Sequence, residues 1–288
     1  MTNKDLISQY VDTGMGIPRY QFDKLSNNDK KTYLRKMVIR IESDAIHKRI
    51  DNLDYYYGEL PESTQIKIVS NNGNFLSYVS RTPSRAVQLA AVNNDATAIR
   101  GILSLGLPLT EEVQLVAVNK DASLIQYIEN PSEQVQLAAV NNDGLCLEEI
   151  QDPSEAVQLA AIKNNGGALQ HIDNPTEAVQ MLAVQQNGYS IQIIENPSEA
   201  VQLAAVKRHG DAIRYIDNPT ESVQFELLKH NPKLLVYARP QNENIQMALV
   251  RKAAELHDYM YVSYLRKPTN DVLMLLNQLN NKIMNINI

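Results

Sequence analysis

Histidine, cysteine and carboxylate side chains are the usual carriers of catalysis and metal binding. In this chain the histidines form neither a His-Glu-x-x-His motif nor another zinc-ligand spacing. They are His47, His171, His209, His230 and His257. The single cysteine, Cys146, stands at a repeated position that is otherwise Ala168, Ser190 and Ala212, which suits packing between helices. We therefore predict no metal site and no cysteine nucleophile.

Glutamates recur at a spacing of 22 residues, and paired carboxylates can perform general acid–base catalysis. They are Glu133, Glu155, Glu177, Glu199 and Glu221. Each of them directly follows an Asn/Asp-Pro-Ser/Thr triplet, as Glu133 follows Asn130-Pro131-Ser132. One structural role, helix capping, therefore explains the series. Gly14 and Gly16 lack the third glycine and the Lys-Ser/Thr of a phosphate-binding loop. The sequence predicts a protein that is not an enzyme and needs no cofactor.

An internal repeat, marked by one glutamine per repeat, organises most of the chain. The glutamines are Gln65, Gln88, Gln114, Gln136, Gln158, Gln180, Gln202, Gln224 and Gln246. From Gln114 onward every step is 22 residues. Fixed self-similarity of this kind is typical of solenoids, in which each repeat buries its apolar face against its neighbours. We predict an all-α fold, an α-solenoid of short two-helix repeats.

Each repeat carries signals for where its helices begin and end. The Asn/Asp of the Asn/Asp-Pro-Ser/Thr-Glu motif is predicted to be the N-cap, which places proline at N1 and glutamate at N3. The glycines of one column are predicted to stop the long helix in the left-handed conformation. They are Gly144, Gly166, Gly188 and Gly210. A second, shorter helix then precedes the next Asn-Pro.

The repeated glutamine falls on the apolar side of its helix. At about 100° per residue, Gln202 lies between Val206 and Ala205, at the centre of the apolar arc. A buried amide without a partner costs about 1–3 kcal/mol, so we predict that the amide bonds backbone groups in a turn of its own or the adjacent repeat. A row of ligand-facing glutamines is the alternative. The central members of this structural column are Gln136, Gln158, Gln180, Gln202 and Gln224.

One position in the short helix varies strongly, although the isoleucine after it is nearly constant. We call this position the variable column, and its predicted partner-binding members are Tyr127, Glu149, His171, Tyr215 and Tyr237. Tyrosine is enriched in protein interfaces because it supplies contact area at low entropic cost. A partner-binding surface and ordinary half-buried packing both fit this pattern.

The two ends of the chain depart from the repeat, and we divide the chain into residues 1–60, 61–260 and 261–288. Residues 1–60 are predicted to form an N-terminal helical cap, with one helix that begins after Ser26 and a second that begins near Ser43. The first helix carries an apolar face made of Tyr33, Leu34, Met37, Val38 and Ile41. A basic, tyrosine-containing surface that contacts RNA or phosphate is the alternative here. Residues 261–288 are predicted to be a C-terminal cap.

Charge and hydropathy narrow the classes of partner. Residues 61–240 hold twelve Lys/Arg against twenty Asp/Glu, a net charge of −8, which disfavours nucleic acid. The sequence has no apolar run of 18 or more residues and its first residues lack a secretory signal. We therefore expect a cytoplasmic protein that does not bind membranes, and a homo-oligomer stays open.

The repeat core resembles a helical repeat of unknown function found in large tailed phages and some intracellular bacteria, whose units read VxLAAVxxNGxALxYA. The matching stretches include VQLAAVNNDG (135–144), VQLAAIKNNGGALQHI (157–172) and VQLAAVKRHGDAIRYI (201–216). The resemblance implies the solenoid fold and a viral context, but no reaction. In that context the expected partner is a host protein that the chain inhibits or redirects, with host defence as one such target. A nucleic-acid-binding array and a sponge for a small signalling molecule are the alternatives.

Overall fold

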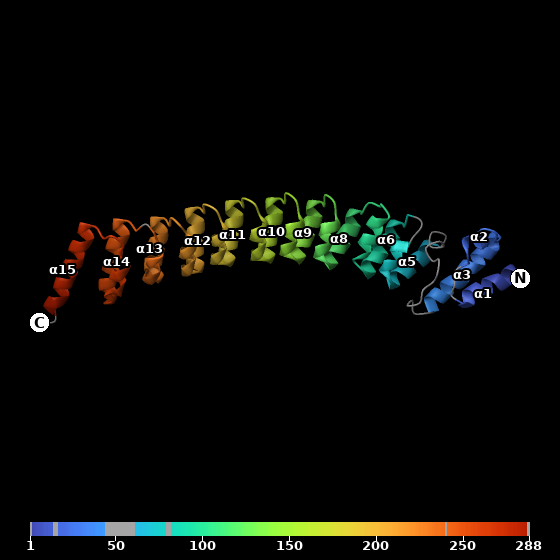
Figure 1. The fold of residues 1–288 in the computed structure, drawn as a ribbon, viewed down its shortest axis with the longest axis horizontal. Coiled ribbons are helices and arrows are strands. Elements are labelled where there is room, and N and C mark those ends of the chain that lie inside the picture. The colour runs from blue at the N-terminus through green and yellow to red at the C-terminus, as the bar shows by residue number, and fades with distance from the viewer. Residues whose placement is uncertain (1, 14–16, 44–60, 79–81, 240, 287–288) are drawn as a thin grey trace. The chain divides into compact units, whose positions relative to one another are not determined.

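The computed structural model describes residues 2–13, 17–43, 61–78, 82–239 and 241–286. The described residues contain helices and turns but no strand. They form two compact bodies, Met1–Gln151 and Asp152–Ile288. Within each body, successive helices pack against their neighbours in the manner of an α-solenoid (Figure 1). The fold class predicted from the repeat is confirmed.

The first body contains three N-terminal helices followed by the first repeats. Its elements are α1 (Asn3–Thr13), α2 (Arg19–Phe22), α3 (Asn27–Ser43), α5 (Glu62–Asn71), η1 (Gly73–Tyr78), α6 (Arg85–Asn94), α7 (Ala98–Ser104), α8 (Glu111–Lys120), η2 (Ala122–Tyr127), α9 (Glu133–Asn142) and η3 (Gly144–Glu149).

The second body contains the most regular repeats and the last helices. Its elements are α10 (Glu155–Asn164), η4 (Gly166–His171), α11 (Glu177–Gln186), η5 (Gly188–Ile193), α12 (Glu199–Arg208), η6 (Gly210–Tyr215), α13 (Glu221–His230), η7 (Pro232–Val236), α14 (Glu243–Leu256), η8 (Tyr259–Tyr264) and α15 (Asn270–Ile286).

A typical repeat consists of a ten-residue α-helix and a six-residue 3₁₀-helix. In α12, the apolar positions Val201 and Ala205 are fully buried, and Ala212 and Ile213 of η6 are buried beneath them. The short second helix predicted from the sequence is therefore present, but as a 3₁₀-helix. Its steeper rise of about 2 Å per residue spans the repeat with few residues.

The predicted helix caps are shifted by two residues. The N-cap of each regular repeat is the Ser/Thr that follows the proline, and its hydroxyl oxygen accepts a hydrogen bond from the N3 backbone N–H, as Ser198 does from Val201 at 3.4 Å. Glutamate is therefore N1, not N3. The Asn or Asp before the proline instead adopts the left-handed conformation, with φ of 49° at Asn196 and 46° at Asp152. Asn and Asp tolerate that region because their short polar side chains bond locally.

The repeated glycine also has a different structural role from the predicted one. Gly188 does not have a positive φ; it begins η5 after Asn187, the extended C-cap of α11. A Cβ on Gly188 would lie 2.5 Å from the carbonyl oxygen of Ala205 in the next repeat. The glycine column therefore permits close approach between neighbouring repeats, and among the described glycines only Gly106 has a positive φ.

The N-terminal helices pack around their own apolar cluster, which includes Ile7, Phe22 and Tyr33. The hydroxyl of Tyr33 accepts a hydrogen bond from the backbone N–H of Ile17 at 3.2 Å. Ser26 caps α3, as predicted, because its Oγ accepts from the N–H of Asp29. The predicted second helix lies almost wholly outside the described residues, as do the side chains of Val38 and Ile41. The partly buried Leu34 packs against both this cluster and the core of the first repeats.

The last helix, α15, packs against α14 and buries Val272 completely. Leu273, which occupies the glutamine position in sequence register, is 43% exposed, so this last helix departs from the repeat. None of the described helices combines the length and the apolar character that a membrane span requires.

Candidate functional site

The side-chain amides of the glutamine column form hydrogen bonds inside the fold. Each side-chain amide donates to the carbonyl oxygen five residues earlier, at the start of its own helix, over 2.9–3.1 Å. The pairs are Gln136 with Pro131, Gln158 with Pro153, Gln180 with Pro175, Gln202 with Pro197, and Gln224 with Pro219. The Oε1 of Gln202 also accepts from the backbone N–H of Thr220 in the next repeat, at 3.3 Å. These glutamines therefore bond the turn that the sequence suggested as their partner.

The glutamate series joins one repeat to the next. The carboxylate of Glu177, at N1 of α11, accepts a hydrogen bond from the hydroxyl of Ser198, the N-cap of α12, at 2.5 Å. The same contact joins Glu155 to Thr176 at 2.5 Å. Hydrogen bonds from Ser222 and Thr220 hold the pKa of Glu199 below its usual value. We refer to these contacts as the cap ladder, and they give the glutamates a structural role that catalysis does not explain.

A second set of contacts joins the other ends of the long helices. The last side chain of a helix donates to a carbonyl near the end of the preceding helix. Asn142 does so to Val118 at 2.9 Å, and Gln186 to Lys163 at 3.3 Å. Both ends of α9 and of α11 are therefore bonded to a neighbouring repeat.

The predicted partner-binding residues fall in two places. In the first body, Tyr127 is half-buried, with the guanidinium of Arg100 4.5 Å from its ring centroid, and Glu149 is exposed. In the second body, His171 is half-buried, whereas Tyr215 is 43% exposed and Tyr237 42%. Tyr127 and Glu149 end the successive 3₁₀-helices η2 and η3, whereas His171 ends η4, Tyr215 ends η6 and Tyr237 directly follows η7.

Sequence reasoning missed an aromatic cluster beside the variable column in the second body. The ring of Tyr189 stacks on His209 with the centroids 4.7 Å apart and the planes within 7°, and its edge meets Tyr215 at 6.3 Å. His209 Nδ1 also accepts a hydrogen bond from the backbone N–H of Gly188. Ile193, a column member not predicted to bind, is 54% exposed and adds apolar surface. The signal in the sequence was Tyr189, which directly follows the repeated glycine Gly188.

An acidic hollow of about 430 Å³ lies between η2 and η3 in the first body. Two carboxylates line it, Glu129 from the turn after η2 and Glu149 from the end of η3. Amide groups of Gln126, Gln136 and Gln151 complete its polar wall, and no Lys or Arg is among the described residues that line it. The arrangement favours a cationic group.

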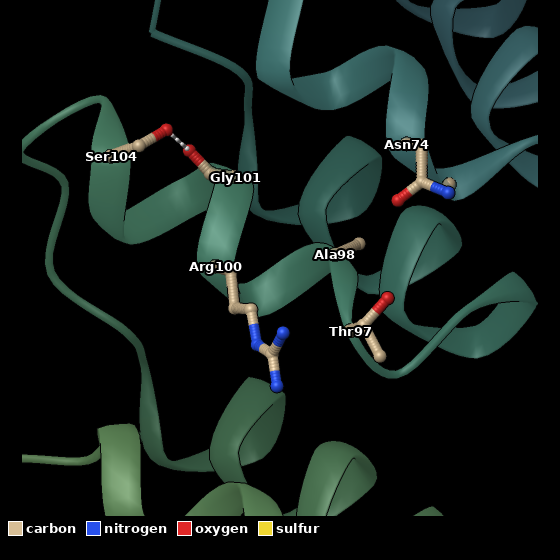
Figure 2. Close-up of a pocket in the computed structure, with 7 residues that line it drawn as sticks. Asn74, Thr97, Ala98, Arg100, Gly101 and Ser104 are labelled. Carbon is tan, nitrogen blue, oxygen red and sulfur yellow. Dashed lines mark hydrogen bonds between the residues drawn. The ribbon is translucent and has the colours of Figure 1, made fainter.

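A second hollow, of about 370 Å³, lies beside α7 (Figure 2). Its polar groups are largely occupied: Thr97 donates to Asp95 at 2.7 Å, and Ser104 to the carbonyl of Gly101 at 2.8 Å. Arg100, which lines this hollow, is the residue that stacks on Tyr127. This hollow is therefore part of the packing between repeats.

The remaining reactive side chain is that of Cys146, a free and buried cysteine. Burial, together with the nearby carboxylates of Asp143, Asp121 and Glu149, raises the pKa of the Cys146 thiol to about 11, so it is protonated at neutral pH. The described residues contain no cluster of His, Cys, Asp and Glu that could hold a metal ion.

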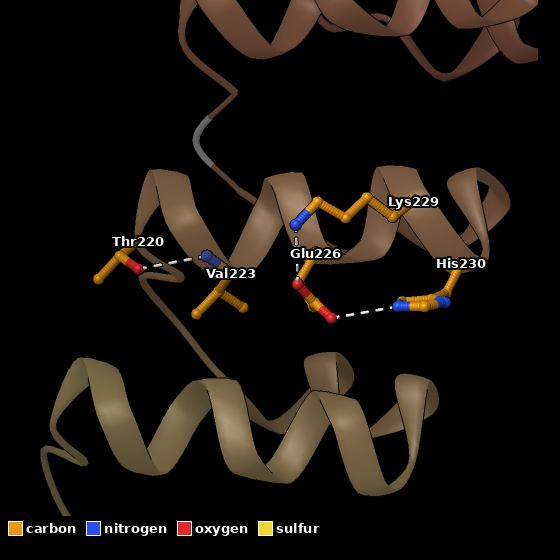
Figure 3. A network of polar contacts seen from close by, with 5 residues as sticks. All are labelled: Thr220, Val223, Glu226, Lys229 and His230. Atoms are coloured by element: carbon orange, nitrogen blue, oxygen red, sulfur yellow. Dashed lines mark hydrogen bonds and ion pairs between the residues drawn. The ribbon is translucent and has the colours of Figure 1, made fainter.

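A polar contact network on α13 is centred on Glu226 (Figure 3), which stands where α12 has Ala204. Glu226 contacts Lys229 at 3.3 Å and His230 at 3.1 Å. Partial burial raises the pKa of Glu226, but hydrogen bonding to Lys229 and the charges of Lys229 and Lys207 outweigh that effect and lower it. All of these partners lie within the repeats, so the network compensates the charge of the Glu226 carboxylate locally.

Comparison with protein-family models, curated protein sequences and solved structures found no match to this chain.

Proposed function

We propose that this chain is a non-enzymatic binding protein whose partner is another protein, held along the variable column beside the 3₁₀-helices. The observation that carries the proposal is the contrast between two adjacent positions. The isoleucines at 172, 194 and 216 are buried in every regular repeat of the second body, whereas Ile193 and Tyr215 just before them are about half exposed.

The chemistry of the exposed positions supports a protein partner. Tyr189, Tyr215, Tyr237 and Ile193 are all more than two fifths exposed in consecutive repeats. Large apolar and aromatic side chains that gather on one face are characteristic of interaction surfaces, and tyrosine is a frequent energetic centre of such surfaces. Hydrogen bonds between repeats hold the scaffold that presents them, and the exposed parts of these side chains are available to a partner.

The nature of the partner follows from the resemblance of the repeat to those of large tailed phages. We propose that the chain acts in the cytoplasm of a host cell and inhibits or redirects a host protein there, with defence proteins as one target. The net charge of −8 over residues 61–240 favours a protein with a basic or polar surface over a nucleic acid.

Site-specific photo-crosslinking tests the proposal. A photoreactive amino acid replaces Tyr215 in the full chain, and one at Lys163, exposed at the end of α10, serves as the control. After exposure to a bacterial lysate, mass spectrometry should find one protein joined to position 215 and absent from position 163. Recovery of nucleic acid alone would favour the nucleic-acid-binding array. Recovery of a small molecule alone would favour the sponge, and either result overturns the proposal.

A further inference from the structure

The backbone after each 3₁₀-helix determines which side chains share a surface. Ile172, Ile194 and Ile216 are extended, with φ between −113° and −96° and ψ between 107° and 117°. In extended backbone, neighbouring side chains point to opposite sides. Because the isoleucine points into the core, the residues before and after it both face solvent. The pairs are His171 with Asp173, Ile193 with Glu195, and Tyr215 with Asp217.

The carboxylates of these pairs carry uncompensated charge. Asp173, Glu195 and Asp217 are exposed, and no ion pair or hydrogen bond joins their side chains to other described residues. They differ in this from the glutamates of the cap ladder, whose carboxylates accept hydrogen bonds from the next repeat. The second body therefore presents one free carboxylate in each of three consecutive repeats.

The acidic hollow of the first body shows how successive repeats combine. Glu129 follows the extended Ile128 and Glu149 belongs to the next repeat, and both line the same hollow. The isoleucines at 172, 194 and 216 have nearly the same backbone angles as Ile128, so we expect corresponding positions to face one another in the second body. The corresponding pairs are Asp173 with Ile193, Glu195 with Tyr215, and Asp217 with Tyr237.

Each of these pairs sets a carboxylate beside an apolar or aromatic side chain, which is a suitable site for lysine or arginine. The aliphatic stem of such a residue packs on the apolar group while the cation reaches the carboxylate or the ring face. The protein already makes this contact within itself. The guanidinium of Arg214 lies 4.0 Å from the ring centroid of Tyr237, and that of Arg100 lies 4.5 Å from Tyr127.

The spacing of the repeats sets the register of a bound chain. Packed helices lie about 8–10 Å apart, and a peptide in the extended polyproline II conformation advances about 3.1 Å per residue, with every third side chain on the same side. An extended segment that runs along the variable column therefore advances about three residues per repeat.

We infer that the second body binds an extended, unstructured protein segment that carries Lys or Arg at about every third position. This inference rests on the proposed function and names the chemistry of its partner. The basic side chains enter the sites formed by Asp173 with Ile193 and by Glu195 with Tyr215. In the third repeat Arg214 already covers the ring of Tyr237, so a basic side chain there pairs with the Asp217 carboxylate.

Fluorescence anisotropy with the full chain and labelled peptides of about fifteen residues tests the register. One peptide repeats Lys-Ser-Ser, a second has the same composition with its lysines adjacent, and a third repeats Glu-Ser-Ser. The spaced lysine peptide should bind several-fold more tightly than the clustered one, and the glutamate peptide should not bind. Equal affinity of the two lysine peptides would overturn the inference, because it would reflect net charge alone.

A charge-matched pair of variants tests the site. Because single exposed ion pairs are weak, we expect Asp173→Asn, Glu195→Gln and Asp217→Asn together to reduce affinity for the spaced peptide about tenfold. The control combines Glu112→Gln, Glu255→Gln and Asp271→Asn, which removes the same charge from exposed positions on other helices. Its affinity should change less than twofold. An equal loss in both triple variants contradicts the inference, and their thermal unfolding curves verify that both remain folded.

The crosslink at position 215 separates failure of this inference from failure of the proposed function. If the triple variant of Asp173, Glu195 and Asp217 captures the same protein in equal yield, while the lysine peptides do not bind, the protein-binding function stands and the basic segment is wrong. If neither the crosslink nor the peptides give a complex, both are wrong.

Discussion

At the scale of single residues, the repeat is held by polar side chains placed where an apolar one is expected. Gln202 is only 7% exposed, yet its amide reaches Pro197 in its own repeat and Thr220 in the next. Its position at the centre of the apolar arc could be deduced from helical periodicity. Its second contact could not, because that contact depends on how the next repeat is placed.

Replacing Gln202 with leucine should lower the free energy of unfolding by about 2 kcal/mol, because the carbonyl of Pro197 and the N–H of Thr220 lose a partner. Urea denaturation followed by circular dichroism measures the change. The control is Gln185→Leu, at an exposed position near the end of α11, which should change the free energy of unfolding by less than about 0.5 kcal/mol. Equal effects of the two substitutions would argue against the structural role of the amide.

The glycine column gives a prediction that depends on what the added methyl group meets. In Gly188→Ala, the new Cβ meets the backbone carbonyl of Ala205, so we expect a loss of about 3 kcal/mol. In Gly210→Ala it meets the flexible end of Leu234 at 2.7 Å, so the loss should be about 1 kcal/mol. Urea denaturation of both variants gives the comparison. A larger loss at Gly210 would show that close backbone approach is not what selects glycine here.

At the scale of the helices, the sequence predicted which elements form but misplaced their ends. The motif Asn196-Pro197-Ser198-Glu199 allows two cap frames, with either Asn196 or Ser198 as N-cap, since both residue types cap helices well. The structure selects Ser198, whose hydroxyl also donates to Glu177 of the preceding repeat. Local preference could not decide this, because the deciding contact crosses between repeats. The exposure of the variable column depends on the same stacking, so the sequence left it open.

The cap ladder should therefore couple neighbouring helices energetically. Ser198→Ala removes both the N-cap of α12 and the bond to Glu177, and should lower the free energy of unfolding by about 1 kcal/mol. Glu177→Gln weakens only the contact between repeats. A double-mutant cycle should give a coupling energy of about 0.5 kcal/mol or more. Strictly additive losses would mean that the two helices are capped independently.

At the scale of the whole molecule, hydrogen bonds and burial move the pKa values of groups in both bodies in directions that limit stability at each end of the pH range. Hydrogen bonds lower the pKa of Asp5 and Asp29 in the first body and of Glu199 in the second. Burial raises the pKa of Tyr33 and of Cys146. The first set favours the charged form in the folded state and the second favours the neutral form.

These pKa shifts give the free energy of unfolding opposite slopes against pH below and above neutrality. A carboxyl group with a lowered pKa in the folded state adds stability above its unfolded pKa of about 4, and that stability is lost as the pH falls through the folded value. A thiol with a raised pKa adds stability below its unfolded pKa of about 8.5, and loses it as the pH rises to about 11. The free energy of unfolding should therefore be highest between about pH 5 and pH 8 and fall on both sides.

Urea denaturation across this pH range tests the curve, and two variants assign its sides. Cys146→Ala should flatten part of the alkaline decline and leave the acid side unchanged, because alanine has no proton to lose. Glu199→Gln should lessen the acid decline and leave the alkaline side unchanged. An alkaline decline of the same steepness in Cys146→Ala would show that the pKa of the thiol is the same in the folded and unfolded chain, and would leave the buried Tyr33 as the group whose ionisation destabilises the fold.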